Sequence, residues 1–174
     1  MNTVKRQHRT VGGIVKIPLK DGYHAYDRIL PGAFFAFYDC DTKQDIDDLQ
    51  SIIDSPILFI TAVENYAVTK GLWRKVGKLP LEETLLAEPK RFIQDPIQPD
   101  KLEIIENGIR RKATLAECKG LERETVWEPE AIQQRMLEYY SGKTSKWLQQ
   151  ILDIDIKPKG QKERVNQYIQ KILG

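Results

Sequence analysis

The most constraining feature of the sequence is the stretch Ile14–Leu30, in which an Asp-Gly pair separates two β-rich runs. Glycine tolerates the positive φ that tight hairpin turns require, so Asp-Gly between such runs is among the strongest short-range hairpin signals. The pattern predicts strands at Ile14–Leu19 and Tyr23–Leu30, joined by a turn that contains Asp21 and Gly22.

Further strand signals continue to about residue 120, with little helix between them. We predict an aromatic-rich strand at Ala33–Asp39, a buried central strand at Ile57–Val63 and a strand at Lys90–Gln94. Asn107-Gly108 predicts a second hairpin. Weaker signals predict a strand near Tyr66–Val68, a loop with Trp73 and one helical turn in Leu81–Leu86.

After about Gly120 the hydrophobic period becomes helical. Glu128-Pro129-Glu130 is typical of a helix start, and Gly142 fits a helix stop. Two more helices are predicted, one capped by Thr144 or Ser145 and carrying Trp147, Leu148, Ile151 and Leu152, the other carrying Val165, Tyr168, Ile169, Ile172 and Leu173.

These patterns predict an α+β fold. Its N-terminal part is antiparallel and mostly β, as a small barrel or curved sheet, and a helical C-terminal part follows. We divide the chain into a mobile basic lead-in (1–12), a mostly β domain (13–120) and a helical extension (125–174). The extension either completes the core or mediates self-association, and the oligomeric state stays open.

The length predicts one domain, or one domain with a small appendage, and the composition predicts a soluble protein with a core of its own. Of 174 residues, 41% are hydrophobic and 30% charged, and the net charge of +2 gives no bulk attraction to nucleic acid. No apolar run approaches the roughly 18 residues of a membrane span. The basic start is not followed by the apolar segment of a signal peptide, so we expect a cytoplasmic protein without membrane contact.

We predict no catalytic residues, metal site or cofactor. His8 and His24 are the only histidines and have no ligand-spaced partner, and HExxH, CxxC and GxSxG are all absent. The acidic run that starts at Asp39 departs from a calcium loop, because Gln44 and Gln50 occupy its glycine and glutamate positions. We expect His24 to be a partly exposed strand residue.

The two cysteines, Cys40 and Cys118, are far apart in the sequence and are expected to be free thiols. Asp39 and Asp41 flank Cys40. Adjacent carboxylates raise a thiol pKa, which argues against a reactive thiolate.

A single-strand nucleic-acid binding module on a small β-barrel is the alternative function. It would need exposed aromatics beside basic residues. Phe35 and Phe37 are more simply explained as core residues, and the nearby aspartates would repel phosphates. Nucleic acid is therefore not the preferred partner, and an enzyme with an unrecognised site is a third, weaker alternative.

The segment from Asp39 to Asp54 carries six aspartates against one lysine. Such a local negative field speeds encounter with a basic partner and adds specificity. Ile46, Leu49, Ile52 and Ile53 recur at helical spacing, so part of the segment is predicted to be a short amphipathic helix. A solvated loop rich in helix-capping residues is the structural alternative.

The opening hairpin resembles the start of the immunity protein 26 family of bacterial polymorphic toxin systems. Its matching residues are Gly13, Ile17, Pro18, Leu19, Asp21, Gly22, Tyr23, Arg28, Ile29 and Leu30. The chain departs from the family at Asp27, where a glycine is frequent. Trp73 and Gly77 match a later family feature, a tryptophan in the loop after the central strand, and the resemblance extends over about residues 12–95.

The resemblance implies a small, mostly β, non-catalytic cytoplasmic protein that binds and neutralises a cognate toxin encoded beside it. It does not assign the toxin contacts. From chemistry alone we propose the acidic segment, with Asp41, Asp45, Asp47, Asp48 and the aromatic Tyr38, expected to be exposed, as the toxin-binding residues.

Overall fold

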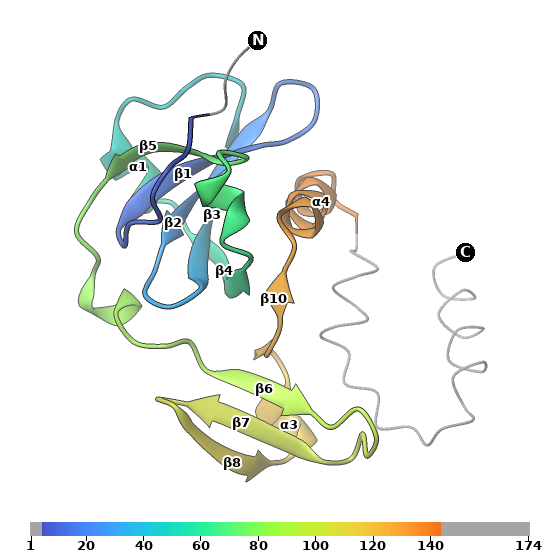
Figure 1. The fold of residues 1–174 in the computed structure, drawn as a ribbon. Coiled ribbons are helices and arrows are strands. Elements are labelled where there is room, and N and C mark those ends of the chain that lie inside the picture. Colours follow the sequence, from blue (N-terminus) through green and yellow to red (C-terminus); the bar gives the residue numbers. More distant parts are fainter. Residues whose placement is uncertain (1–4, 144–174) are drawn as a thin grey trace.

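The computed structural model describes residues 5–143 of the chain. It is α+β, as predicted: two mixed β-sheets are accompanied by short helices, and a longer helix follows near residue 130 (Figure 1). The predicted helices at residues 144–174 lie outside the described residues.

The first sheet has six strands in the order β10-β4-β3-β2-β1-β5. They are β1 (Gly13–Pro18), β2 (His24–Ile29), β3 (Phe34–Thr42), β4 (Ile57–Val63), β5 (Arg74–Lys78) and β10 (Val126–Trp127). Among the described residues the sheet is open, with β10 and β5 at its ends, so these strands do not close into the small barrel that was one of the two predicted forms. Only the β10–β4 pair is parallel.

The predicted hairpin is confirmed as β1 and β2. Asp21 and Gly22 both have positive φ (57° and 79°), as a type I′ turn requires. The amide of Tyr23 donates to the carbonyl of Lys20 at 3.1 Å, and the amide of Leu19 donates to the carbonyl of Tyr23 at 2.8 Å. The turn therefore fixes the register of the central strands.

One face of this sheet is covered by α2 (Tyr66–Thr69) and α4 (Pro129–Tyr140). Trp73 is completely buried there and meets Phe35 and Phe37 edge-on, with ring centroids 5.8 and 6.0 Å away. The prediction that Phe35 and Phe37 face the core is confirmed. Ile132 and Met136 of α4 belong to the same cluster, so α4 completes this core.

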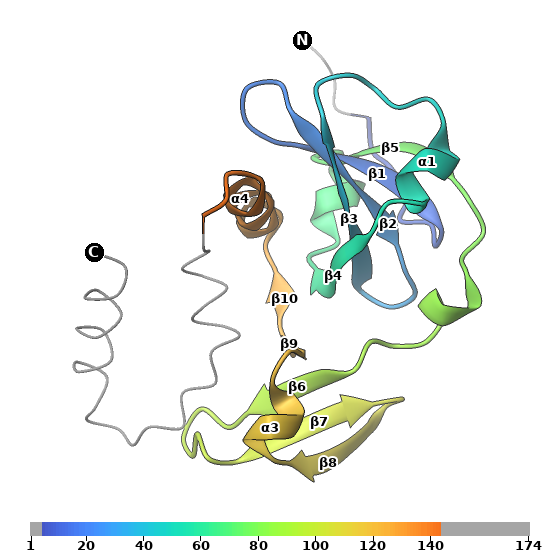
Figure 2. The same ribbon diagram turned by 180° about the vertical axis from the view of Figure 1, so that it is seen from behind.

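The opposite face is covered by α1 (Leu49–Ile53) and by η1 (Glu83–Leu85), a turn of 3-10 helix. Ile52 of α1 packs on Ile14, Tyr26 and Tyr38, and Leu85 of η1 packs in a neighbouring cluster. Figure 2 shows α1 on the side of the sheet away from α4. The first sheet is thus enclosed on both faces.

The second sheet has four strands in the order β8-β7-β6-β9, namely β6 (Arg91–Gln94), β7 (Leu102–Glu106), β8 (Ile109–Ala113) and β9 (Glu122–Arg123). The helix α3 (Leu115–Cys118) covers one face, where Phe92, Ile104 and Cys118 are buried. The hairpin predicted at Asn107-Gly108 is confirmed. The sheet adds its own small core beside the first.

Two arginines join the sheets. The guanidinium of Arg91, at the start of β6, lies 4.7 Å from the ring centroid of Phe34 in β3. Arg135 of α4 donates to both carboxylate oxygens of Glu122 at 3.2 and 2.6 Å, and its guanidinium lies 3.5 Å from the centroid of Phe59. Charged groups stacked on aromatic rings thus bridge the two units.

Two strand predictions need correction. Tyr66–Val68 lies in the helix α2 instead of a strand. In the helix, Ala67 and Val68 both pack into the same core cluster as Trp73. The strand at Ile57–Val63 exists, but only its second half is buried and Ile57 is 40% exposed. Its outer neighbour, β10, pairs only with Ala62 and Val63 and leaves the first half open.

The lead-in was predicted to be mobile, but its described part, residues 5–12, is hydrogen-bonded to the first sheet and its helix α2. The side-chain amide of Gln7 donates to the carbonyls of Val68 and Trp73 at 3.0 and 2.7 Å. Arg9 donates to the carbonyls of Leu30 and Phe34 at 3.0 and 2.9 Å. These bonds tie the chain across the core before β1 begins.

Gly12 allows the lead-in to enter β1. Its φ is +85°, and a Cβ there would lie 2.5 Å from the carbonyl oxygen of Leu79. Its amide donates to the carbonyl of Ile29 at 2.8 Å, and its carbonyl accepts from the amide of Leu79 at 3.1 Å. Both the backbone angle and the close approach require glycine.

We predict that Gly12→Ala destabilises the fold more than Gly22→Ala. Both positions have a left-handed φ, which costs an alanine about 1 kcal/mol, but a Cβ at Gly22 would meet nothing within 4 Å. Urea unfolding monitored by tryptophan fluorescence measures both. Equal losses of unfolding free energy would show that the contact with Leu79 does not matter.

Candidate interaction surface

The acidic segment runs from the end of β3, through a loop, into α1, and so lies along one end of the first sheet (Figure 2). Asp41, Asp45, Asp47 and Asp48 are all exposed. The four predicted carboxylates therefore lie on one continuous stretch of surface chain, but the structure gives them different roles.

Asp45 contributes to the fold as well as to the surface. Its carboxylate forms an ion pair with the ammonium of Lys16 in β1, and this contact lowers the pKa of Asp45. The imidazole Nε2 of His24 lies 3.6 Å from the same carboxylate. Asp45 thus fastens the loop to the first hairpin while its outer side faces solvent.

His24 and Tyr26 of β2 form the base beneath this loop. The Nε2 of His24 lies 3.0 Å from the hydroxyl of Tyr26, which accepts a hydrogen bond from the amide of Ile46 at 3.1 Å. The expectation of a partly exposed histidine is wrong, since His24 is only 4% exposed. The acidic loop folds over it, and this burial lowers the pKa of His24.

Asp48 and Asp39 also have structural bonds. The carboxylate of Asp48 accepts the amide of Gln50 at 3.1 Å and caps the N-terminus of α1, whose existence confirms the predicted short helix. Asp39 accepts a hydrogen bond from the hydroxyl of Tyr139 in α4 at 3.1 Å. The capping interpretation of the segment therefore holds for part of it.

Asp41 and Asp47 are the two of the four predicted carboxylates that form no structural bond among the described residues. Neither side chain has a hydrogen bond or ion pair with any of residues 5–143. Asp41 lies in β3 opposite Ala25, and Asp47 precedes the cap of α1. These two carboxylates have no role in holding the described fold, so they are the ones most available to a partner.

Tyr38 does not belong to this surface. Its side chain is 1% exposed and packs with Ile14, Tyr26 and Ile52, so the expectation of an exposed aromatic is wrong. The strand pattern treated one face of β3 as solvent-facing, whereas α1 covers that face. The hydroxyl of Tyr140 also donates to the carbonyl of Tyr38 at 3.2 Å.

A surface hollow of about 290 Å³ lies between the acidic loop and β5. Asp45 and Asp47 line it from one side, and Arg74 and Lys75 line it from the other. Its apolar lining includes Ile46, Leu49 and Val76. The mixed charges suit a polar side chain of a protein partner better than a small ligand of one charge.

The family-like residues are structural. Arg28 is completely buried and binds the carboxylate of Glu82 with two hydrogen bonds of 3.0 and 2.7 Å. A Cβ on Gly77 would lie 2.3 Å from the Cδ1 of Leu49, so glycine lets α1 approach β5. The family-like residues of the hairpin, and Trp73 and Gly77 later in the chain, therefore stabilise the fold.

The pattern of the family described as Immunity protein 26 matches residues 10–103, which is more than half of the chain. The chain belongs to the immunity protein 26 family. No curated protein and no solved structure matches it significantly. The family membership confirms the resemblance seen in the opening hairpin and covers all of β1 to β6, ending within β7.

Within residues 5–143, no three His, Cys, Asp or Glu side chains group as metal ligands, and no helix is long and apolar enough to cross a membrane. Both cysteines are free thiols, as predicted. Burial, and after it Asp41 and Asp39, raises the pKa of the Cys40 thiol.

Asp27, the departure from the family pattern, is a buried carboxyl in the middle of β2. It is completely buried, and neither carboxylate oxygen has a hydrogen-bond partner among the described residues. Burial raises its pKa well above the usual range, against a smaller opposing effect of Arg9. With no solvent access it cannot reach a substrate, so it is a feature of the core and not a catalytic acid.

Sequence reasoning missed the contacts of β2. Every residue from His24 to Ile29 is buried, although His24, Asp27 and Arg28 are polar. Alternation within one strand shows which residues share a face, but not that both faces are covered. The helical spacing of Ile46, Leu49 and Ile52 was the one signal that something packs on the second face.

We predict that Asp27→Asn makes the protein more stable near pH 8 and changes its stability little near pH 4. The folded state holds the carboxyl proton above the pH at which the unfolded chain releases it. Stability is therefore lost as pH rises from the unfolded pKa of about 4 toward the raised folded value. Asparagine cannot ionise and removes this loss.

Urea unfolding of both proteins across this pH range measures the effect. Asp100→Asn, an exposed position, removes the same charge without the burial and serves as the control. A constant difference between Asp27→Asn and the native chain at every pH would show that Asp27 does not titrate in this way.

Proposed function

We propose that this protein neutralises a cognate toxin of a bacterial polymorphic toxin system by binding it in the cytoplasm, without catalysis. The observation that carries the proposal is the family match over residues 10–103. Binding by complementary surfaces needs a rigid scaffold more than reactive groups. The enclosed first sheet, with its family residues in the core, is such a scaffold.

The acidic segment is the proposed toxin-contacting surface. Asp41, Asp45, Asp47 and Asp48 present negative charge at one end of the sheet, and the loop that carries three of them is fixed by Lys16 and Tyr26. Enzymes that act on nucleic acids or nucleotides have basic clefts, so a fixed acidic loop complements such a toxin. Electrostatic attraction would mainly speed association.

Nucleic acid is a poorer partner for the same surface. Of the aromatics near the hairpin that could stack with bases, Tyr26, Phe35, Phe37 and Tyr38 are buried, which leaves Tyr23, 42% exposed beside Lys43. Single-strand binding needs such rings on the surface, beside cations.

The function is tested by co-expression with the C-terminal domain of the protein encoded immediately upstream. We expect that domain to stop bacterial growth alone and growth to be restored by this protein, because the two form a complex that occludes the toxin. Size-exclusion chromatography of the purified mixture measures the complex. Growth arrest that persists, with no complex formed, contradicts the proposal.

The surface is tested by reversing the two carboxylates without structural bonds, in Asp41→Lys/Asp47→Lys. We expect association with the same toxin domain to slow by about tenfold at low salt, and the difference to shrink at high salt because ions screen the attraction. Surface plasmon resonance measures the rate constants.

Glu64→Lys/Asp100→Lys is the matched control. Both positions are exposed and lie outside the acidic segment, and the pair makes the same change in net charge. If the control slows association as much as the double variant does, the effect comes from net charge and the acidic segment is not the contact surface.

A further inference from the structure

The strand β8 forms the open outer edge of the second sheet (Figure 1). Its residues from Ile109 to Lys112 are all exposed, and the side chain of Ile109 is 70% exposed. On its inner side β8 pairs with β7 along its full length. Within residues 5–143, no strand pairs with the other side of β8, so β8 is an edge strand of the described fold.

The backbone of this edge is arranged to accept another strand. A two-residue turn joins Glu106 to Ile109, so these two form a hydrogen-bonded pair of the ladder with β7. Alternation then turns the backbone N–H and C=O of Arg110 and Lys112 outward. Of these groups only the carbonyl of Lys112 has a partner in the described chain, the guanidinium of Arg111 at 3.3 Å.

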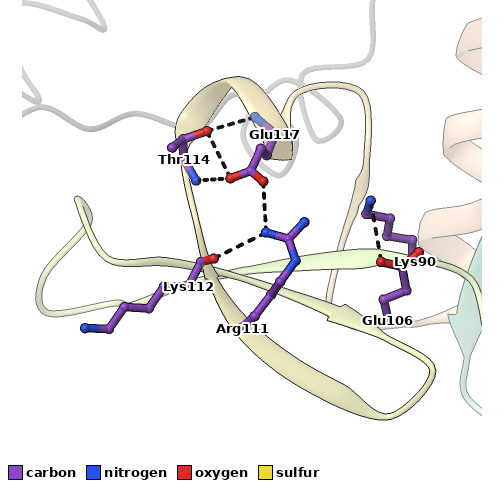
Figure 3. A network of polar contacts seen from close by, with 6 residues as sticks. All are labelled: Lys90, Glu106, Arg111, Lys112, Thr114 and Glu117. Carbon is purple, nitrogen blue, oxygen red and sulfur yellow. Dashed lines mark hydrogen bonds and ion pairs between the residues drawn. The ribbon is translucent and has the colours of Figure 1, made fainter.

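Three cationic side chains lie along this edge, and carboxylates pair with two of them. Figure 3 shows Arg111 and Lys112. The guanidinium of Arg111 donates to Glu117 at 2.9 Å, and Glu117 completes a capping box with Thr114 at the start of α3. On the other face Arg110 donates to Glu103 at 2.6 Å. The ammonium of Lys112 contacts no carboxylate of the described residues.

These charges decide which strand can pair with β8. A second copy of β8 placed antiparallel would put Arg110 against Lys112, and like charges directly opposite each other are destabilising. Cations on an edge strand disfavour pairing with neutral or basic strands in the same way. Acidic side chains at alternate positions would instead face Arg110, which already pairs with Glu103, and Lys112, which has no ion pair among the described residues.

We propose that β8 is a docking edge for an extended segment of a partner protein that carries acidic side chains at alternate positions. The segment adds as a fifth strand beside β8, with backbone hydrogen bonds to Arg110 and Lys112. This surface lies after residue 103, outside the family match, and is separate from the acidic segment. The proposal does not depend on the immunity function.

The test is an NMR titration of the ¹⁵N-labelled full chain with a short capped peptide of alternating valine and glutamate. We expect saturable shifts of the Arg110 and Lys112 amides at millimolar peptide, because those N–H groups gain acceptors. A peptide of alternating valine and lysine should bind at least about tenfold more weakly. The absence of shifts at these amides with the acidic peptide overturns the proposal.

Two variants separate edge pairing from simple charge attraction. Lys112→Pro removes an outward N–H without removing a bond to β7, and proline is tolerated at such edge positions. Lys112→Gln removes the charge but keeps the N–H. We expect the proline variant to bind the acidic peptide at least about tenfold more weakly than the glutamine variant, with its spectrum otherwise unchanged.

Equal binding by the two variants overturns strand addition, because the charge alone would then account for binding. A titration with oligothymidine tests whether nucleic acid binds the same edge. If the oligonucleotide shifts the same amides more strongly than the acidic peptide does, the edge is a nucleic-acid surface and the proposal is wrong.

Discussion

The buried guanidinium of Arg28 is the interaction on which the arrangement of the first sheet depends. It lies on β2, in the middle of the sheet, and binds Glu82 and the carbonyls of Leu79 and Pro80 in the chain that leaves β5. A completely buried guanidinium needs hydrogen-bond acceptors, and Glu82, although half exposed, supplies its counter-charge. Arg28 therefore fixes the path by which the chain passes from the first sheet toward the second.

Burial of the second face of the first sheet explains why the acidic segment is held in place. One face of the sheet packs on α2 and α4, which leaves Ile14, Tyr26 and Tyr38 apolar on the other face. α1 covers that face with Ile52, and the loop before it is bonded to Tyr26 and Lys16. The aspartates are thus held on a rigid base, although two of them, Asp45 and Asp48, serve the fold as well as the surface.

The molecule combines a shared scaffold with surfaces of opposite charge. The family match covers β1 to β6, and the acidic segment lies within it, whereas the basic edge of β8 lies beyond it. Arg91 and Arg135 hold the second sheet against the first by stacking on Phe34 and Phe59. Because both surfaces are attached to packed sheets, either can be presented to a partner without ordering a flexible segment, which lowers the entropic cost of binding.

The sequence by itself determined the local elements whose signals are local. Asp21-Gly22 and Asn107-Gly108 specify type I′ turns because their backbone angles depend on those residues alone, and Pro129 marks the start of α4 for the same reason. The alternation of Phe35 and Phe37 identified one face of β3 as core. The family resemblance was likewise carried by the hairpin.

Only the tertiary structure decided what covers the second face of the sheet, and therefore which polar residues are buried. His24 and Tyr38 looked exposed because strand alternation assigns faces but not their neighbours, and α1 and its loop come from a later part of the chain. Asp27 and Arg28 are adjacent in sequence, yet among residues 5–143 the carboxyl of Asp27 has no hydrogen-bond partner, whereas Arg28 is a paired cation. Their difference depends on Glu82, more than fifty residues away, because burial and pairing are set by long-range packing.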